Sequence, residues 1–284
     1  MSIKVENLTH IFNKGLAYET VAVDDVSFEI PDGGFVGIIG HTGSGKSTLI
    51  QHLNGLLKPD SGSVIIGETD ITAKKVSMID IRRKIGLLFQ YPEYQLFDET
   101  VASDIAFGPK NLGLDEEEID ARVREAMIMV DMPYHEFADR SPFELSGGQK
   151  RRIAIAGVIA MKPEVLILDE PTAGLDPRSH RDILDMILRV KKETNNTVIL
   201  VSHNMDDIAE LADLVLVMHE GKIIKQGSPR AVFTQGEYLK SIGLGIPFAT
   251  ELAEQLKQNG FKIDIEIMNM EDIETQICRG LGSK

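Results

Sequence analysis

Eight residues near the N-terminus, from Gly40 to Ser47, have the composition of a loop that binds phosphate. They match G-x-x-x-x-G-K-[ST] in full. The glycines let successive backbone N–H groups point at an anion, Lys46 would reach the β- and γ-phosphates, and the Ser47 hydroxyl would ligate Mg²⁺. We therefore predict a nucleoside triphosphate site. Its predicted loop residues are Gly40, His41, Thr42, Gly43, Ser44, Gly45, Lys46, Ser47 and Thr48.

Two carboxylates and a histidine follow apolar runs that are typical of buried strands. Asp169 and Glu170 come after the run 165–168, and His203 comes after the run 197–201. Parallel α/β sheets place their ligands at the carboxyl ends of strands, so we expect these side chains to reach the phosphates. Asp169 can hold Mg²⁺ through its water shell. Glu170 can accept a proton from an attacking water.

A helix is predicted to open with two glycines, which is unfavourable by about 1 kcal/mol each relative to alanine. Three cations follow at its positive end, where they are also unfavourable when exposed. Several preferences for residues at a helix start are violated together here, which happens more often at functional sites. We therefore favour a functional interpretation of Ser146, Gly147 and Gly148. For Lys150, Arg151 and Arg152, pairing with acids elsewhere is the favoured interpretation. The segment that opens this helix is Leu145, Ser146, Gly147, Gly148 and Gln149.

Two aromatic residues lie between the first two expected strands, near the phosphate loop in sequence. Phe12 and Tyr18 can each stack on an adenine ring, because base–aromatic stacking tolerates any base. An ordinary place in the core or at its rim is equally compatible with either residue. The sequence leaves this choice open.

These residues are carried by alternating apolar strands and amphipathic helices, the pattern of an α/β fold with a mostly parallel core sheet. A helix should follow the phosphate loop and end at Lys58-Pro59. A second helix is expected from Asp115 to Val130, with Asp115 as its N-cap. Strands and hairpins are predicted at 3–12, 21–30, 35–39, 61–72, 84–90, 165–170, 197–201 and 214–226.

The pattern changes after residue 227, which predicts two domains, 1–227 and a small α/β extension at 228–284. Within the extension we expect a helix from Phe248 that ends at Asn259-Gly260, an alternating strand at 262–267 and a last helix at 270–277.

Composition restricts the partners. The 284 residues carry a net charge of −14, which is the reverse of what sequence-independent nucleic-acid binding requires. The longest uncharged, mainly apolar run, 153–161, is shorter than the ~20 residues that span a bilayer. No secretory signal is expected, and the single cysteine, Cys278, suits a reducing cytoplasm.

Six motifs in one order resemble the ATP-binding cassette (ABC) ATPases over residues 1–227. This resemblance implies an ABC-type P-loop fold with an antiparallel β subdomain and a helical subdomain at about 91–160. It implies that Gln90 touches Mg²⁺ or the attacking water and that Ser146–Gln149 covers the ATP of an opposite subunit. It further implies that Asp176 lies at the dimer interface and that His203 contacts the γ-phosphate. ATP and Mg²⁺ are the implied cofactors.

The segment Gln90–Phe97, Gln-Tyr-Pro-Glu-Tyr-Gln-Leu-Phe, closely resembles the energy-coupling factor (ECF) transporter ATPases. The resemblance implies a motor subunit for import of vitamins or transition-metal ions. The expected partners are a second ABC ATPase, with a heterodimer favoured, and a transmembrane coupling protein docked near Gln90–Phe97. That protein would hold a substrate-binding membrane subunit, and this chain would lie peripherally on the cytoplasmic face of the membrane.

Three rival functions are compatible with parts of the sequence. A soluble ABC ATPase acting on nucleic acid or ribosomes usually has two cassettes or a long coiled-coil insertion, and neither is visible here. A non-catalytic cassette would not need Lys46, Glu170 and His203 together. The ATPase of an ordinary importer or exporter differs only in the segment after Gln90 and in the extension.

Overall fold

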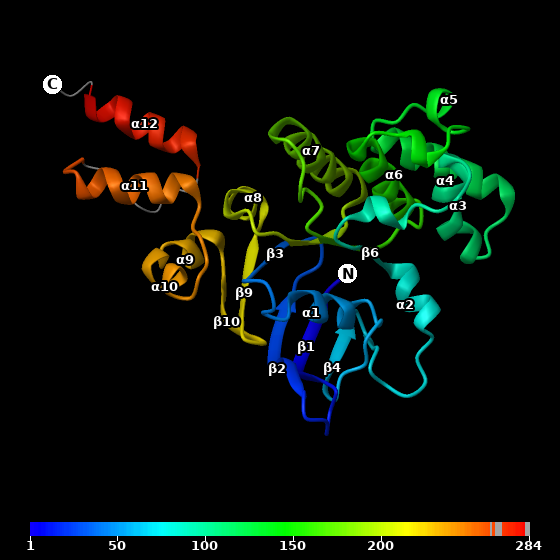
Figure 1. Ribbon diagram of the computed structural model, residues 1–284, viewed down its shortest axis with the longest axis horizontal. Coiled ribbons are helices and arrows are strands. Elements are labelled where there is room, and N and C mark those ends of the chain that lie inside the picture. Colours follow the sequence, from blue (N-terminus) through cyan, green and yellow to red (C-terminus); the bar gives the residue numbers. More distant parts are fainter. Residues whose placement is uncertain (262, 265–268, 282–284) are drawn as a thin grey trace.

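Two sheets organise the chain in a computed structural model that describes residues 1–261, 263–264 and 269–281 (Figure 1). The larger sheet has the strand order β10-β9-β3-β8-β7-β6, in which β9, β3, β8, β7 and β6 are parallel and β10 pairs antiparallel at the edge. The smaller sheet is antiparallel, in the order β2-β1-β4-β5. The predicted α/β class with an antiparallel subdomain is confirmed. The strands are β1 Ile3–Phe12, β2 Thr20–Ile30, β3 Phe35–Ile39, β4 Ser61–Ile66, β5 Thr69–Asp70, β6 Ile85–Leu88, β7 Val165–Asp169, β8 Thr197–Val201, β9 Leu214–His219 and β10 Lys222–Gly227.

The central strands are continuously apolar because both faces of the large sheet are covered. Val36 and Ile38 point into the core that α1 (Lys46–Leu53) and the small sheet share with the large one. Phe35 and Ile39 point to the opposite core, which is filled by helices. That second layer holds α6 (Gly147–Ile159) and α7 (Pro177–Thr194), among others.

A helical lobe lies beside the large sheet and is built mainly from α3, α4 and α6, which contact one another (Figure 1). The predicted helix at 115–130 is confirmed as α4, and Asp115 caps it by accepting the backbone N–H of Glu118. The remaining helices of this part of the chain are α2 Met78–Lys84, η1 Pro92–Gln95, α3 Val101–Asn111, α4 Glu116–Met129, α5 Tyr134–Phe137, η2 Pro142–Glu144 and α8 Met205–Leu211.

The helix after the phosphate loop is shorter than predicted, because it ends at Leu53 and not at Lys58-Pro59. Gly55 adopts a left-handed backbone with φ of 69°. The N–H of Leu56 donates to the carbonyl of Gln51, and the N–H of Gly55 donates to the carbonyl of His52. This is a Schellman motif, which satisfies the last carbonyls of the helix and stops it before the proline.

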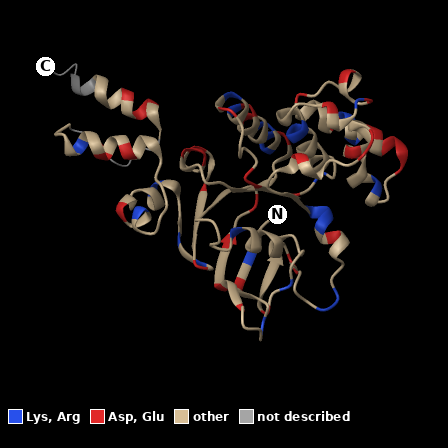
Figure 2. Ribbon diagram, viewed as in Figure 1, with Lys and Arg blue, Asp and Glu red and all other residues tan. Residues whose placement is uncertain are grey.

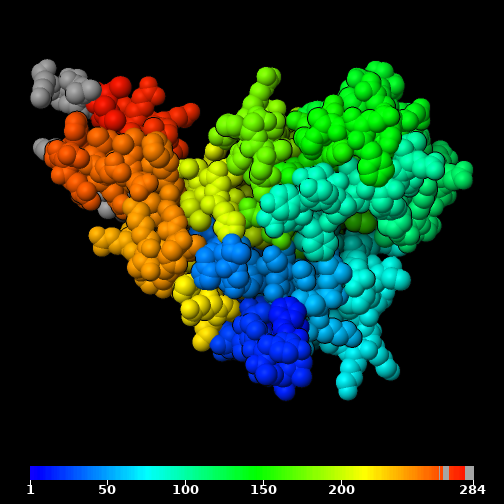
Figure 3. All heavy atoms as spheres, in the orientation of Figure 1, coloured from blue at the N-terminus to red at the C-terminus, as the bar shows by residue number. Residues whose placement is uncertain are grey.

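The extension after residue 227 is helical in its described part: α9 Pro229–Phe233, α10 Gly236–Ser241, α11 Phe248–Gln258 and α12 Met270–Leu281. Val232, Phe233 and Leu239 are buried in the main core. A separate apolar cluster begins only at α11, around Ala249 and Ala253. Figure 3 shows α11 and α12 as an orange and red lobe beside the body. The helices predicted from Phe248 and from 270 are confirmed, whereas most of the strand predicted at 262–267 lies outside the described residues.

Candidate active site

The phosphate loop connects β3 to α1, as the sequence predicts. Gly45 is the N-cap of α1 with φ of 101°, and a side chain there would collide with the carbonyl oxygen of Ala22. Only glycine tolerates both the left-handed backbone and this close approach. Lys46 folds back into the loop, where its ammonium donates to the carbonyls of Gly40 at 2.7 Å and His41 at 3.0 Å. Burial lowers the pKa of Lys46, partly offset by the charges of Glu170 and Asp169.

The order of the strands brings the other predicted residues to this loop. β8 lies between β3 and β7, and Val201 at the end of β8 is the register partner of both Ile38 and Asp169. Hence the carboxyl ends of all three strands meet at one edge of the sheet. Asp169 ends β7, and His203 comes two residues after β8.

Ser47 and Asp169 form the candidate magnesium site. The Ser47 hydroxyl donates to Oδ2 of Asp169 at 3.2 Å. Burial raises the pKa of Asp169, while the Ser47 hydrogen bond and the charge of Lys46 lower it. A hydroxyl and a carboxylate are hard oxygen ligands, so this donor set fits Mg²⁺.

Glu170 is the candidate general base. Its Oε1 is buried without a hydrogen bond and lies 3.4 Å from Nε2 of His203. Burial raises the pKa of Glu170 to about 7, although a backbone hydrogen bond at His203 acts in the opposite direction. Burial also lowers the pKa of His203, and the charge of Lys46 adds to that effect. A carboxyl group poised near neutrality with a free oxygen is suited to accepting a proton from water.

One cavity of about 360 Å³ collects these side chains. Phe12 lines it, whereas Tyr18 is 66% exposed and is not among the lining residues. Residues 20–22 at the start of β2 also line it, and the sequence interpretation missed them because they look like ordinary strand residues. The lining residues are Phe12, Thr20, Val21, Ala22, Thr42, Gly43, Gly45, Lys46, Ser47, Thr48, Gln90, Asp169, Glu170 and His203.

The segment Leu145–Gln149 lies outside this cavity. Ser146 is the N-cap of α6, and its side chain and that of Gln149 form a reciprocal capping box. A Cβ atom added at Gly147 or Gly148 would meet nothing within 4 Å, so this helix start presents open backbone to its surroundings. Leu145 is buried and packs in the main core. Asp176 also lies outside the cavity, as the N-cap of α7.

Two of the cations that follow this segment pair with acids, as favoured from the sequence. Arg151 is buried, forms a bidentate pair with Glu93 of η1 at 3.0 Å, and donates to the carbonyls of Pro171 and Ala173. Arg152 pairs with Asp131 at 3.1 Å. The penalty of placing cations at the helix start is thus offset by tertiary contacts.

A largely apolar groove of about 550 Å³ lies beside the segment after Gln90. Phe97 and Phe107 line it with their rings edge to face at 4.9 Å, and both are about half exposed. Arg82 and Arg83, in the last turn of α2, also line it, and Figure 2 shows the basic end of α2 in blue. Tyr94, at 85% exposure, is also presented to the outside. Such an exposed apolar surface with a polar rim is typical of a protein interface.

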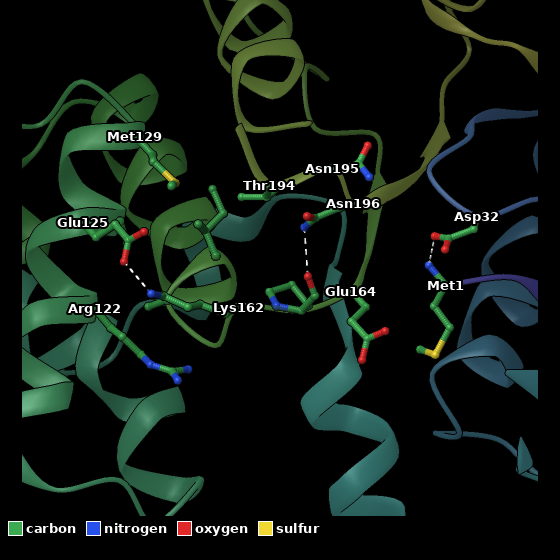
Figure 4. Close-up of a pocket in the computed structure, with 14 residues that line it drawn as sticks. Met1, Asp32, Arg122, Glu125, Met129, Lys162, Glu164, Thr194, Asn195 and Asn196 are labelled. Atoms are coloured by element: carbon green, nitrogen blue, oxygen red, sulfur yellow. Dashed lines mark hydrogen bonds and ion pairs between the residues drawn. The ribbon is translucent and has the colours of Figure 1, made fainter. Parts of the chain in front are cut away.

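Another cavity, of about 450 Å³, is shown in Figure 4 and contains none of the predicted site residues. Two pairs of charged groups lie among its lining residues: Lys162 with Glu125, and the amino group of Met1 with Asp32. Asn196 is likewise bonded to the carbonyl of Pro163. This cavity therefore lies away from the phosphate loop and from the strand ends that carry Asp169, Glu170 and His203.

Comparison with known proteins gives consistent results. Residues 23–173 match the ABC transporter family. The energy-coupling factor transporter ATP-binding protein EcfA2 of Clostridium tetani is 57% identical over 100% of this chain and 99% of the relative. The protein of the same name from Clostridioides difficile is 56% identical over 98% of this chain and 97% of the relative.

Two solved structures resemble the fold. The first is cbiO1 from Clostridium perfringens, described as part of the ABC transporter complex cbiONQ, with a TM-score of 0.74, 39% identity, and coverage of 84% of this chain and 93% of that one. The second is the dimeric ATP-binding cassette MJ0796 bound to ADP and Pi, with a TM-score of 0.71, 28% identity, and coverage of 80% and 98%. No described helix is long and apolar enough to cross a membrane.

Proposed function

The chain belongs to the ATP-binding proteins of energy-coupling factor transporters within the ABC family, and we propose that it is the ATP-hydrolysing motor of an importer for vitamins or transition-metal ions. The observation that carries this proposal is that Lys46, Glu170 and His203 line one cavity, together with other residues of a complete phosphate loop. Residues 40–48 bind the triphosphate, and Lys46 turns from the loop carbonyls to the β- and γ-phosphates. Glu170 accepts a proton from the attacking water. His203 contacts the γ-phosphate.

We infer that Ser47, Asp169 and Gln90 hold Mg²⁺ in this site. When bound, the ion would neutralise charge that develops on the phosphates. The contact between Ser47 and Asp169 and the position of Gln90 on the cavity wall support this assignment.

We further propose that two such ATPases bind ATP between them, with a heterodimer favoured. Residues 145–149 and Asp176 would act on the partner's nucleotide, which is supported by their position outside this chain's own cavity. The unobstructed Gly147 and Gly148 would let a phosphate approach the start of α6 closely.

The coupling protein would dock in the groove beside Gln90–Phe97, where Phe97 and Phe107 supply apolar contact. Through it the chain would act indirectly on the substrate-binding membrane subunit, from a peripheral position on the cytoplasmic face. We propose residues 1–227 as the ATP-binding domain and 228–284 as an extension that contributes to dimerisation, although residues 232–246 of the extension pack in the main core.

The test is a pull-down through a tag on the full chain, from detergent-solubilised membranes of the native host. Recovery of a second ATPase with a polytopic membrane protein is expected, and small membrane subunits in the same sample would identify the substrates. Phe107→Glu should abolish recovery of the membrane protein while ATP binding persists. Ile128→Glu, an equally drastic change at an exposed site outside the groove, is the matched control and should recover it fully. Recovery of ribosomes or nucleic-acid proteins alone would overturn the transport function and leave ATP hydrolysis standing.

A further inference from the structure

The short helix α8 begins two residues after His203, with Asn204 between them as its N-cap. Asn204 is the N-cap of α8, and its side-chain oxygen accepts the N–H groups of Asp206 at 3.0 Å and Asp207 at 3.4 Å. The N–H of Asn204 in turn donates to the Ser202 hydroxyl at 3.0 Å. His203 therefore lies between Ser202 and Asn204, which are hydrogen-bonded to each other. Because Asn204 caps α8, a rotation of α8 would move His203.

α8 also packs directly on the strand that delivers the phosphate loop. Ile208 is fully buried against β3, so closely that a Cβ atom at Gly37 would lie 2.7 Å from its Cγ2 atom. The helix thus has little room to shift along the sheet. It also contacts α9 and α11, and a side-chain contact joins it to α7.

The contact between α7 and α8 is a partly buried pair. Nε2 of His180, in the first turn of α7, lies 2.9 Å from Oδ1 of Asp207. The Asp207 side chain is only 8% exposed, and its other oxygen, Oδ2, is buried without a hydrogen bond. Burial raises the pKa of Asp207, while the hydrogen bond and charge of His180 lower it. His180 is thus the principal hydrogen-bond partner that Asp207 has in this environment.

His180, the other residue of the pair, is bonded to the turn at Asp176. The N–H of His180 donates to the Asp176 carbonyl at 2.9 Å, in the same turn that the Asp176 side chain caps through Arg178 and Ser179. His180 therefore contacts two elements: its backbone N–H bonds the turn that would face the partner's nucleotide, and its side chain bonds the helix that follows His203. Figure 2 shows the acidic first turn of α8 in red.

We propose that His180 is a positioning residue: by holding Asp207, it fixes His203 relative to the turn at Asp176 and so couples the two ATP sites of the dimer. This inference rests on the proposed function, since it needs His203 and Asp176 to act at nucleotides. His180 touches neither nucleotide. Its effect on hydrolysis is exerted through α8.

The structure provides a matched control within the same pair of helices. Arg181 and Glu210 also bridge α7 and α8, at 3.0 Å, but both side chains are at least half exposed. Exposed pairs contribute little to stability because water and salt screen them. If the partly buried pair of His180 and Asp207 has a specific role, loss of the exposed pair of Arg181 and Glu210 should not reproduce its effect.

The experiment compares His180→Leu, His180→Gln and Glu210→Gln in the complex isolated through a tag on this chain. For His180→Leu we expect the kcat of ATP hydrolysis to fall about tenfold, as for a lost buried hydrogen bond, with KM for ATP nearly unchanged. The Hill coefficient for ATP should fall toward one. His180→Gln keeps an N–H near the same position and should restore most of both values, and Glu210→Gln should resemble the wild type.

A wild-type kcat and Hill coefficient in His180→Leu would overturn the inference, as would an equal loss in Glu210→Gln or failure of His180→Gln to rescue. If His180→Leu does not fold, Asp207→Asn, which keeps the shape of the side chain, replaces it with the same expected kcat loss. A wild-type complex that binds or hydrolyses no ATP would instead overturn the proposed function.

Discussion

At the residue scale, the site depends on carboxyl groups whose chemistry is changed by burial. Glu170 is 9% exposed, has φ of 50°, and its backbone N–H donates to the carbonyl of Val201 at 3.0 Å. A left-handed backbone at a residue other than glycine is uncommon, and such conformations cluster at functional sites. Here the backbone turn aims the side chain back at the phosphate loop, one residue beyond the strand end that holds Asp169.

Replacing Glu170 by Gln tests its role as the base. Because the amide cannot accept the proton from water, hydrolysis should fall ~10²–10⁴-fold. ATP binding and dimer closure do not need the proton acceptor, so the variant should accumulate as a stable ATP-bound dimer. Single-turnover hydrolysis and size-exclusion chromatography with ATP measure the two effects. Full hydrolysis in Glu170→Gln would remove Glu170 from the mechanism.

The raised pKa of Glu170 also predicts how the stability of the nucleotide-free chain depends on pH. The native carboxyl keeps its proton up to about pH 7, whereas the unfolded one releases it near 4.5. The native state therefore loses stability as the pH rises through this window, by about 3 kcal/mol from this group. Glu170→Gln should lack this loss, so that its advantage over the wild type is larger at pH 8 than at pH 5. Urea unfolding at the two pH values measures it, and an advantage independent of pH would contradict the assignment.

At the scale of elements, a single buried cation joins three segments that are distant in sequence. Arg151 of α6 reaches η1 through Glu93 and the loop after Glu170 through the carbonyls of Pro171 and Ala173. Arg151 therefore links the predicted docking segment, the helix α6 and the loop that follows the candidate base Glu170.

Breaking this buried pair should be costly, since it leaves a charge without its partner. We expect Arg151→Met to destabilise the fold by ~3–5 kcal/mol and Glu93→Gln by ~1–3 kcal/mol, because Arg151 keeps its two carbonyls in the second variant. Asp120→Asn breaks the exposed pair of Asp120 with Arg124 and serves as control, with an expected change below about 0.5 kcal/mol. Equal losses in the buried and exposed variants, measured by urea unfolding, would show that Arg151 is not a structural junction.

At the scale of the whole molecule, two segments of the C-terminal extension differ in what they pack against. Residues 232–246 contribute buried side chains to the main core, and α11 and α12 form their own cluster. The segment of α11 and α12 is joined to α8 through the N–H of Phe248, which donates to Oδ1 of Asp206 at 2.8 Å.

Truncated chains test the contributions of these two segments to stability separately. A chain ending at residue 247 keeps Val232, Phe233 and Leu239 and should melt cooperatively close to the full-length temperature. A chain ending at residue 227 loses these fully buried side chains, each worth ~1.5–3 kcal/mol, and should be insoluble or melt far lower. Circular dichroism melts of the two chains measure the difference, and equal melting of both would place the structural boundary at 227.

The sequence alone determined the phosphate loop, the strand-end acids, the fold class and most element positions, because these depend on local residue types and on periodicity. It misplaced the end of α1, where a Schellman turn acts before the proline, and left Phe12 and Tyr18 undecided. Only the tertiary structure placed Phe12 on the cavity and Tyr18 away from it, paired Arg151 with Glu93, and joined His180 to Asp207. Such pairings depend on how distant segments pack, and no local pattern encodes the partner. The same packing raised the pKa of Glu170, since desolvation is a property of the assembled core rather than of the residue.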